Sequence, residues 1–241
     1  MSAPFSIGPG ITIGAGIDIG IPPQLVLSLD AAGYTSGPWI DSIASRSFTL
    51  YNGVTYDSGN GGSLIFDTAS EQYADCTSSL SDLSKWTVEL WHYYDGTNDG
   101  VDGGDGACII TELFPGTTGN INYSIGNDAA VGSVTELQSG FFDGGWRATP
   151  AGYSLTPNNW YQIVGTYNGS TVNLYVNNTL INSTNYAGSP ISSGGGIRLM
   201  RRWDNADYWG GKLAIVNIYD GAMGSGGVSI SWNTHKARFG L

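Results

Sequence analysis

The chain has 241 residues and a formal net charge of −11, and only 12% of its residues are charged. This length suits one large domain or at most two small ones. Apolar residues at 41% exclude a disordered chain, and 37 glycines favour a β protein rich in turns. The acidic balance excludes nucleic-acid binding through a broad basic surface. No apolar run is long enough to span a membrane, and no secretory signal is predicted at the N-terminus.

Residues 1–23 differ in composition from the rest of the chain. Isoleucines occupy odd positions and glycines occupy most even positions, so an extended chain has one isoleucine face and one nearly bare face. Such a strand is weak alone and becomes useful when another backbone meets its edge or bare face. We predict an assembly arm that docks on another subunit, with packing on its own domain as the alternative. Its isoleucines are Ile7, Ile11, Ile13, Ile17, Ile19 and Ile21.

Short alternating runs begin near Gln24 and predict one domain over 24–241. The clearest pattern is 160–181, where Asn168-Gly169 separates two alternating runs. Both residues tolerate positive φ, which predicts a type I′ turn within a β-meander that has one buried face. No helix is predicted, apart from a short turn in 77–84, because no segment has a convincing 3.6-residue period. The other predicted strands are 24–30, 63–67, 86–94, 107–113, 120–125, 133–137, 196–202, 212–219 and 228–232.

Many short strands divided by glycine-rich turns indicate a sandwich or a barrel. Cys76 and Cys108 are too few for a disulfide framework, and two free buried thiols are favoured over a pair. The basic residues Arg198, Arg201, Arg202 and Lys212 are expected to be solvated strand residues, with a local basic patch as the alternative.

Several stretches carry a resemblance to one known family. They are LVLSLDAAGY (25–34), TYDSGNGGSLIFD (55–67), WTVELW (86–91), NNWYQIVGTYNGSTVNLYVNNTLI (158–181) and RRWDNADYWGGKLAIVNIYDGAM (201–223). In this order they resemble the concanavalin A-like lectin/glucanase superfamily, in its laminin G-like branch. The resemblance implies an all-β fold, a two-sheet antiparallel jelly-roll-like sandwich, to which the extended Gly/Ile-rich N-terminal arm is joined. It also implies ligand binding on a concave face or at rim loops, and calcium at the rim of many members.

Both ends of the chain resemble segments of bacteriophage structural proteins. The tail NTHKARFGL (233–241) resembles the ends of such domains in virion proteins. The segment SIGPGITIGAGIDIG (6–20) resembles the starts of structural proteins of phages, notably those that infect marine cyanobacteria.

The carboxylates do not follow the pattern of a glycosidase. Glycoside hydrolysis needs two carboxylates at a set separation, and the hydrolase branch of this family resembles E-x-D-x-x-E on one strand. Here every glutamate is isolated, with Glu89 and Glu112 in predicted strands. No Ser-His-Asp set, P-loop or dinucleotide fingerprint is present. We therefore predict that the protein is not an enzyme.

Two groups of residues are candidates for binding. Calcium prefers oxygen ligands on a flexible loop, and the loop 95–106 offers Asp95, Asp99, Asp102 and Asp105, with a solvated acidic loop as the alternative. Sugars need flat apolar surfaces and planar polar side chains, with a core role for the aromatics as the alternative. The candidate glycan contacts are Trp146, Arg147, Trp203, Asp204, Asn205, Tyr208 and Trp209.

The leading interpretation is a virion structural protein, such as a capsid decoration, head fibre or tail-associated subunit. It is expected in the virion, attached by its arm to other virion proteins, and as a homo-oligomer. The alternative is a carbohydrate-binding module that recognises host-surface glycans. No nucleic acid partner is expected, and calcium is the one candidate cofactor.

Overall fold

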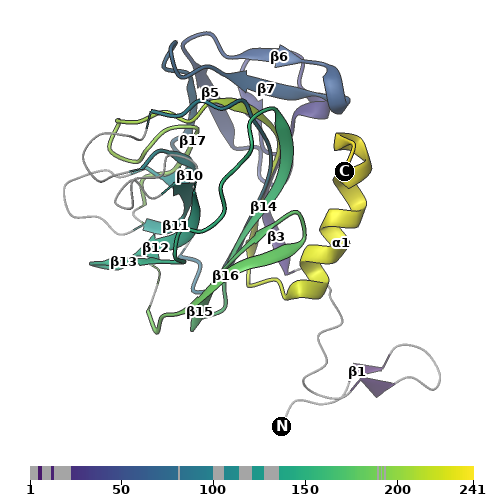
Figure 1. Cartoon of the computed structure of the whole chain (residues 1–241), viewed down its shortest axis with the longest axis vertical. Coiled ribbons are helices and arrows are strands. Elements are labelled where there is room, and N and C mark those ends of the chain that lie inside the picture. The colour runs from purple at the N-terminus through teal and green to yellow at the C-terminus, as the bar shows by residue number, and fades with distance from the viewer. Residues whose placement is uncertain are drawn as a thin grey trace.

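A computed structural model describes residues 5–6, 12–13, 23–80, 82–99, 106–113, 121–127, 136–188, 190, 192 and 194–241. Two antiparallel sheets form a sandwich, and one α-helix lies against one of them (Figure 1). The predicted all-β sandwich is confirmed. In the arm, β1 (Phe5–Ser6) pairs with β2 (Thr12–Ile13). The other predicted arm residues, Ile7, Ile11, Ile17, Ile19 and Ile21, lie outside the described residues.

The first sheet, called the helix-side sheet, has the strand order β16-β15-β14-β9-β18-β7-β6, and β3 also pairs with β18. Short turns connect the strands of its hairpins. Strands β9 and β18 lie at the centre of the sheet. Its strands are β3 (Gln24–Asp30), β6 (Thr55–Asp57), β7 (Ser63–Phe66), β9 (Trp86–Tyr94), β14 (Asn159–Tyr167), β15 (Thr171–Val176), β16 (Thr179–Asn185) and β18 (Gly211–Asp220).

The second sheet has the strand order β13-β12-β11-β10-β17-β8-β5-β4. Short 3₁₀ turns η1 (Ala31–Gly33), η2 (Gly59–Gly61) and η4 (Lys236–Phe239) complete the described elements together with α1 (Ser225–His235). The strands of the second sheet are β4 (Trp39–Ile40), β5 (Ser47–Tyr51), β8 (Tyr73–Cys76), β10 (Cys108–Glu112), β11 (Ile121–Asn127), β12 (Leu137–Phe142), β13 (Trp146–Ala148) and β17 (Ile197–Leu199).

The main core lies between the two sheets. Alternate side chains point inward, so Leu90 of β9 and Ile125 of β11 are fully buried. Aromatic rings join the sheets: Phe141 of β12 lies 4.7 Å from Tyr167 of β14, between ring centroids. Burial of each large apolar side chain stabilises the fold by roughly 1.5–3 kcal/mol. Cys76 and Cys108 are buried free thiols, as predicted.

The prediction of a strand at 228–232, and of no helix, is wrong, because these residues form part of α1. The alternation of Val228, Ile230 and Trp232 suggested a strand. A stripe with helical spacing is also present, at Val228, Ser231, Trp232 and His235. Two of these four residues are polar, so the stripe does not have the apolar face that predicts a helix. Packing on the sheet decides between the two patterns, because short helices gain most of their stability from tertiary contacts. None of the described helices is long and apolar enough to cross a membrane.

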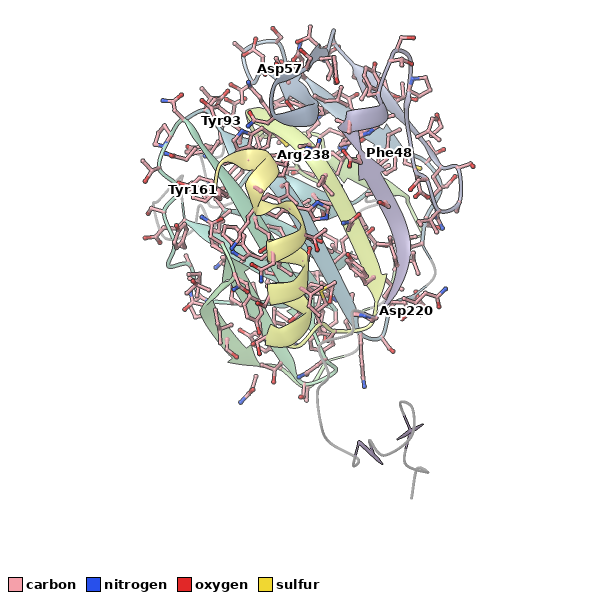
Figure 2. All side chains as sticks on the ribbon, turned by 90° about the vertical axis from the view of Figure 1, so that its right-hand side faces the viewer. Phe48, Asp57, Tyr93, Tyr161, Asp220 and Arg238 are labelled. Carbon is pink, nitrogen blue, oxygen red and sulfur yellow. The ribbon has the colours of Figure 1, made fainter. Side chains whose placement is uncertain are left out.

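Helix α1 lies along the outer face of the helix-side sheet (Figure 2). Trp91 of β9 stacks on Trp232, with ring centroids 5.7 Å apart, and on Phe239 at 4.6 Å. Beyond the helix, Arg238 donates to the carboxylate of Asp30 at 2.8 Å. Strand β14 is therefore buried on both faces, whereas β15 is buried mainly on its core face and β16 is largely exposed. The prediction of one buried face is wrong for β14.

A buried carboxylate lies beneath α1. Glu89 is fully buried on β9, and its oxygens accept hydrogen bonds from side chains of three strands and the helix. A buried charge is tolerated only when such donors replace water. Ser231 supplies the donor from α1, which ties the helix to the sheet. The other donors are Trp91 at 3.0 Å, Gln162 at 2.9 Å, Asn217 at 3.2 Å and Tyr219 at 3.4 Å.

The predicted type I′ turn is at a different hairpin. At Asn168-Gly169 only Gly169 has a positive φ, and the amide of Asn168 donates to the carbonyl of Thr171 across a longer turn. The two-residue turn with both φ angles positive is Asn177-Asn178, between the paired residues Val176 and Thr179. Asparagine tolerates this conformation better than most residues do, which explains the turn at Asn177-Asn178.

The described core contains an uncharged histidine, His92. Its Nε2 accepts from the indole of Trp209 at 3.0 Å, so Nδ1 carries the proton and donates to the carbonyl of Lys212, also at 3.0 Å. Burial lowers the pKa of His92 to about 3, because the imidazolium would lose its hydration.

We predict that the fold loses stability as the pH falls below the ordinary histidine pKa. The unfolded chain binds a proton at His92 below about pH 6.5, whereas the native state binds it only near pH 3. The free energy of unfolding therefore falls by up to about 1.4 kcal/mol for each pH unit between these values. Urea unfolding from pH 7 to pH 4 measures this slope.

The matched variant is His92→Gln, which keeps an acceptor for Trp209 and does not titrate. Its unfolding free energy should depend on pH less steeply than that of the wild type over this range. Equal slopes for the two proteins would contradict the assignment of a neutral His92.

Candidate functional site

The outer face of the second sheet carries a hollow of about 450 Å³, on the side of the sandwich away from α1. On β11, Tyr123 and Ile125 face the core, so Ser124 and Gly126 face outward and line the hollow. Its volume falls in the range of small-ligand sites. The described lining residues are Gly106, Cys108, Ser124, Gly126, Asn127, Gln138, Gly140, Trp146, Ala148, Thr149, Pro150, Thr184, Tyr186, Arg202 and Trp203.

The floor of the hollow is built from small residues in register. Ser124 of β11 lies opposite Gly140 of β12, which lies opposite Ala148 of β13. A Cβ atom on Gly140 would lie 2.5 Å from the carbonyl oxygen of Arg147. Glycine is required there because the strands approach closely, and it leaves the floor free of large side chains.

Two tryptophans distant in sequence flank this floor. Trp146 begins β13 and is 45% exposed, with its ring centroid 5.6 Å from that of Phe142. Trp203 belongs to the loop 201–209, called the tryptophan loop, which follows β17. The hollow therefore combines aromatic surface with the neutral polar side chains of Gln138 and Thr184.

The tryptophan loop is fastened to the sheet by Arg198 of β17. The guanidinium is 4% exposed and donates to both carboxylate oxygens of Asp75 on β8, at 2.8 and 2.7 Å. Its Nη1 also donates to the carbonyl of Arg202 at 3.0 Å and to Oδ1 of Asn205 at 2.8 Å. One side chain thus joins two strands to two points of the loop. The expectation that Arg198 is solvated is wrong, because strand alternation places it under the loop.

Inside the tryptophan loop, Arg202 is paired with two carboxylates. It donates to Asp207 at 2.6 Å and also forms an ion pair with Asp204. Its guanidinium carbon lies 5.4 Å from the centroid of the Trp203 ring. These contacts hold the indole beside the hollow and place Arg202 in its lining.

The candidate glycan contacts fall into three groups. Trp146 and Trp203 line the hollow, whereas Arg147 lies beside it, paired with Asp143 at 2.9 Å and stacked 5.9 Å from the centroid of Tyr186. Asp204 and Asn205 hold the tryptophan loop. The third group, Tyr208 and Trp209, is buried.

The prediction of Trp209 as a ligand contact is wrong. Its side chain is fully buried, and its indole nitrogen donates to His92 in the core. Tyr208 is 8% exposed and its hydroxyl faces Glu71 at 3.4 Å. Packing of the loop end against β9 explains both, since Trp209 pairs with Asn98 just beyond that strand.

Sequence reasoning missed Tyr186 and Gln138, which also line the hollow. Gln138 lies between the core residues Leu137 and Ser139 on β12. Strand alternation therefore predicts that its side chain points outward, once the bounds of the strand are known. Tyr186 follows an edge strand of the other sheet, and no local pattern connects it to Trp146.

The predicted calcium loop is described only in part. Asp102 and Asp105 lie outside the described residues, and Asp95 accepts from the amide of Thr97 at 2.8 Å. Burial raises the pKa of the Asp99 carboxyl, and the nearby carboxylate of Asp207 raises it further. Within the described ranges, no group of three or more His, Cys, Asp or Glu side chains could hold a metal ion. Calcium binding by 95–106 therefore stays a prediction.

The two glutamates in strands lie on different sheets. Glu89 is enclosed beneath α1, while Glu112 of the second sheet accepts from the amide of Asn122 at 2.7 Å and from the hydroxyl of Ser192 at 2.6 Å. Neither is among the residues that line the hollow.

The fold and the hollow define a lectin-like sandwich domain. The profile of the concanavalin A-like lectin/glucanases superfamily matches residues 67–229, and the chain belongs to this superfamily. A search of curated proteins finds no match.

Solved structures with the same fold include binding domains and parts of enzymes. Domain 4 of AbnA, an extracellular arabinanase of Geobacillus stearothermophilus solved with arabinotriose, has a TM-score of 0.64 at 13% identity, over 87% of this chain and 98% of that one. The binding domain of Paraclostridial Mosquitocidal Protein 1 has a TM-score of 0.66 at 19% identity, over 88% of this chain. The binding domain of botulinum neurotoxin DC, solved with SialylT, has a TM-score of 0.63 at 15% identity, over 88% of this chain. This chain spans about half the length of the two toxin domains.

We predict that Asp75→Asn destabilises the protein by roughly 3 kcal/mol, because it leaves the charge of Arg198 buried without its partner. Hydrogen exchange at the amides of Asn205 and Trp209 should also accelerate, since the tryptophan loop loses its anchor. Denaturant unfolding and exchange measured by mass spectrometry check both effects.

Asp143→Asn is the matched control, because it makes the same change in the more exposed ion pair with Arg147. Its effect on the free energy of unfolding should stay within about 1 kcal/mol. Equal effects of the two substitutions would contradict an anchoring role for Arg198.

Proposed function

We propose that this chain is a glycan-binding domain and that the hollow is its binding site. The observation that carries the proposal is the convergence of Trp146 and Trp203 on one hollow of ligand size. These residues are distant in the sequence, and Trp146 is 45% exposed. Large exposed aromatic surface around a hollow is typical of a recognition site.

The chemistry of the lining suits a sugar. The apolar C–H face of a pyranose or furanose ring packs against an indole, which presents a rigid flat surface. Amide and hydroxyl groups such as those of Gln138 and Thr184 exchange hydrogen bonds with sugar hydroxyls. The glycine and alanine floor leaves room for the ring between them.

The structural relatives support the proposal by analogy of fold alone. The arabinanase domain was solved with an arabinose trisaccharide, and the neurotoxin domain was solved with SialylT. At these identities the resemblance carries no individual residue over to this chain.

We further propose that binding occurs without catalysis. Glu89 and Glu112 are both nearly inaccessible, and each accepts hydrogen bonds that tie structural elements together. A retaining or inverting glycosidase needs two carboxyl groups that flank the bond to be cleaved. The described lining of the hollow includes no carboxylate.

The binding proposal predicts that Trp146→Ala and Trp203→Ala each weaken glycan binding by at least about tenfold, or about 1.4 kcal/mol. A glycan array that includes arabino-oligosaccharides identifies a ligand, and isothermal titration then compares the variants. Tyr56→Ala is the control, because Tyr56 is also exposed but lies on β6 of the other sheet. A silent array, or equal affinities for all the proteins, would contradict the proposal.

A second proposal concerns the arm. We propose that the chain is a virion structural protein that attaches to other virion proteins through residues 1–23 and displays the sandwich outward. The alternation of isoleucine and glycine supports this, because such a strand needs a partner backbone.

The arm proposal predicts that the full chain is oligomeric and that a chain lacking residues 1–23 is monomeric with an unchanged melting temperature. Strand β3 begins at Gln24, so the deletion removes no sandwich strand. Size-exclusion chromatography with light scattering distinguishes the two states. An oligomer that survives the deletion, or a monomeric full chain, would contradict the role of the arm in self-assembly.

A further inference from the structure

We propose that the hollow selects neutral glycans and discriminates against acidic ones, because the cation in its lining is already paired with two carboxylates. The inference rests on the proposed glycan site and names the class of ligand that this site accepts. It comes from the charges around Arg202.

Arg202 is the one Lys or Arg among the described residues that line the hollow. All nine basic residues of the chain lie in the described ranges, so no other Lys or Arg remains to be placed there. Its Nη1 donates to Asp207 and its Nη2 donates to Asp204. Arg202 is 8% exposed, while the carboxylates of Asp204 and Asp207 are partly exposed. The guanidinium of Arg202 and the two carboxylates together carry a formal net charge of −1.

The surroundings of this group are acidic as well. The carboxylates of Asp207, Glu71 and Asp67 all act to raise the pKa of Asp99, in addition to the effect of its burial. Several carboxylates, Asp207 among them, therefore lie around Asp99. A carboxylate or sulfate on a sugar in the hollow would meet a negative potential, and juxtaposed like charges oppose binding strongly.

The neighbouring cations are also paired. Arg147, which lies over Tyr186 at the edge of the hollow, forms an ion pair with Asp143. Arg201 stacks 4.6 Å from the Tyr73 ring centroid and 4.9 Å from that of Tyr208, away from the hollow lining. Recognition of an acidic sugar would require Arg202 or Arg147 to break an existing pair, whereas a neutral sugar requires no such change.

The discrimination should weaken when the paired charges are removed without changing the shape of the side chains. Asp207 has a φ of 34°, in the left-handed region that asparagine tolerates well, so Asp207→Asn suits the backbone. Asp204 accepts from the amide of Ala206, and asparagine retains a carbonyl oxygen for this bond. The double variant leaves Arg202 with its positive charge unbalanced inside the hollow.

The experiment first uses a glycan array that contains neutral glycans and their sialylated and uronic-acid counterparts. Isothermal titration then measures the best neutral ligand and its acidic counterpart. The wild type should bind the neutral ligand at least tenfold more tightly. In the double variant Asp204→Asn/Asp207→Asn, the affinity for the acidic counterpart should rise at least fivefold, with the neutral affinity changed by less than about threefold.

Asp57→Asn is the matched control, since it makes the same substitution in the Lys212 pair on the helix-side sheet, outside the lining of the hollow, and it should leave the preference for neutral ligand unchanged. If the double variant unfolds, salt provides a second measurement on the wild type. Raising the salt concentration from 0.05 M to about 0.5 M should increase the affinity for the acidic ligand and not for the neutral one, because screening weakens the repulsion.

Preferential binding of acidic glycans by the wild type would overturn the inference but not the proposed glycan site. A folded double variant that gains no affinity for the acidic ligand would also overturn the inference and not the site. A protein that binds neither class would instead overturn the proposed function itself.

Discussion

The ion pair with Asp75 holds the guanidinium of Arg198 in the second sheet, where it also bonds to the tryptophan loop, and the geometry of the hollow depends on these contacts. Arginine suits this position because its planar guanidinium presents five donors in fixed directions. Two of its nitrogens meet the Asp75 carboxylate, and the third meets Arg202 and Asn205 in the loop. Enclosing such a charge costs several kcal/mol unless every partner is in place. These contacts therefore stabilise the loop in the arrangement in which Trp203 lies beside the hollow.

The two outer faces of the sandwich differ in what covers them. On the helix-side sheet, α1 covers Trp91 and supplies Ser231 to the buried carboxylate of Glu89, so the helix covers the centre of this face. On the second sheet, the described residues leave a hollow between Trp146 and the tryptophan loop. This asymmetry is the physical basis for placing recognition on the second sheet and structure on the other.

The strands and the fold could be predicted from the sequence, because the alternation of apolar and polar residues is a local pattern. For example, the predicted strand 86–94 coincides with β9. Helix α1 was not readable, because half of its sheet-facing stripe is polar and Ser231 is matched to a glutamate far away in sequence. In the site, composition identified Trp146 and Trp203 but could not separate them from the core residue Trp209. That distinction depends on which way a loop folds over a sheet, and here Arg198 on a neighbouring strand decides it. Long-range ion pairs of this kind leave no local trace in the sequence.

In the proposed function, a sugar packs between Trp146 and Trp203. The most direct measurement is a two-dimensional NMR titration that follows the eight tryptophan indole N–H signals, assigned by substitution, as a neutral oligosaccharide is added. We expect the signals of Trp146 and Trp203 to shift with a common saturating dependence, while the buried Trp209 and Trp86 stay in place. Shifts confined to other tryptophans, such as Trp232 beside α1, would contradict a binding site in the hollow.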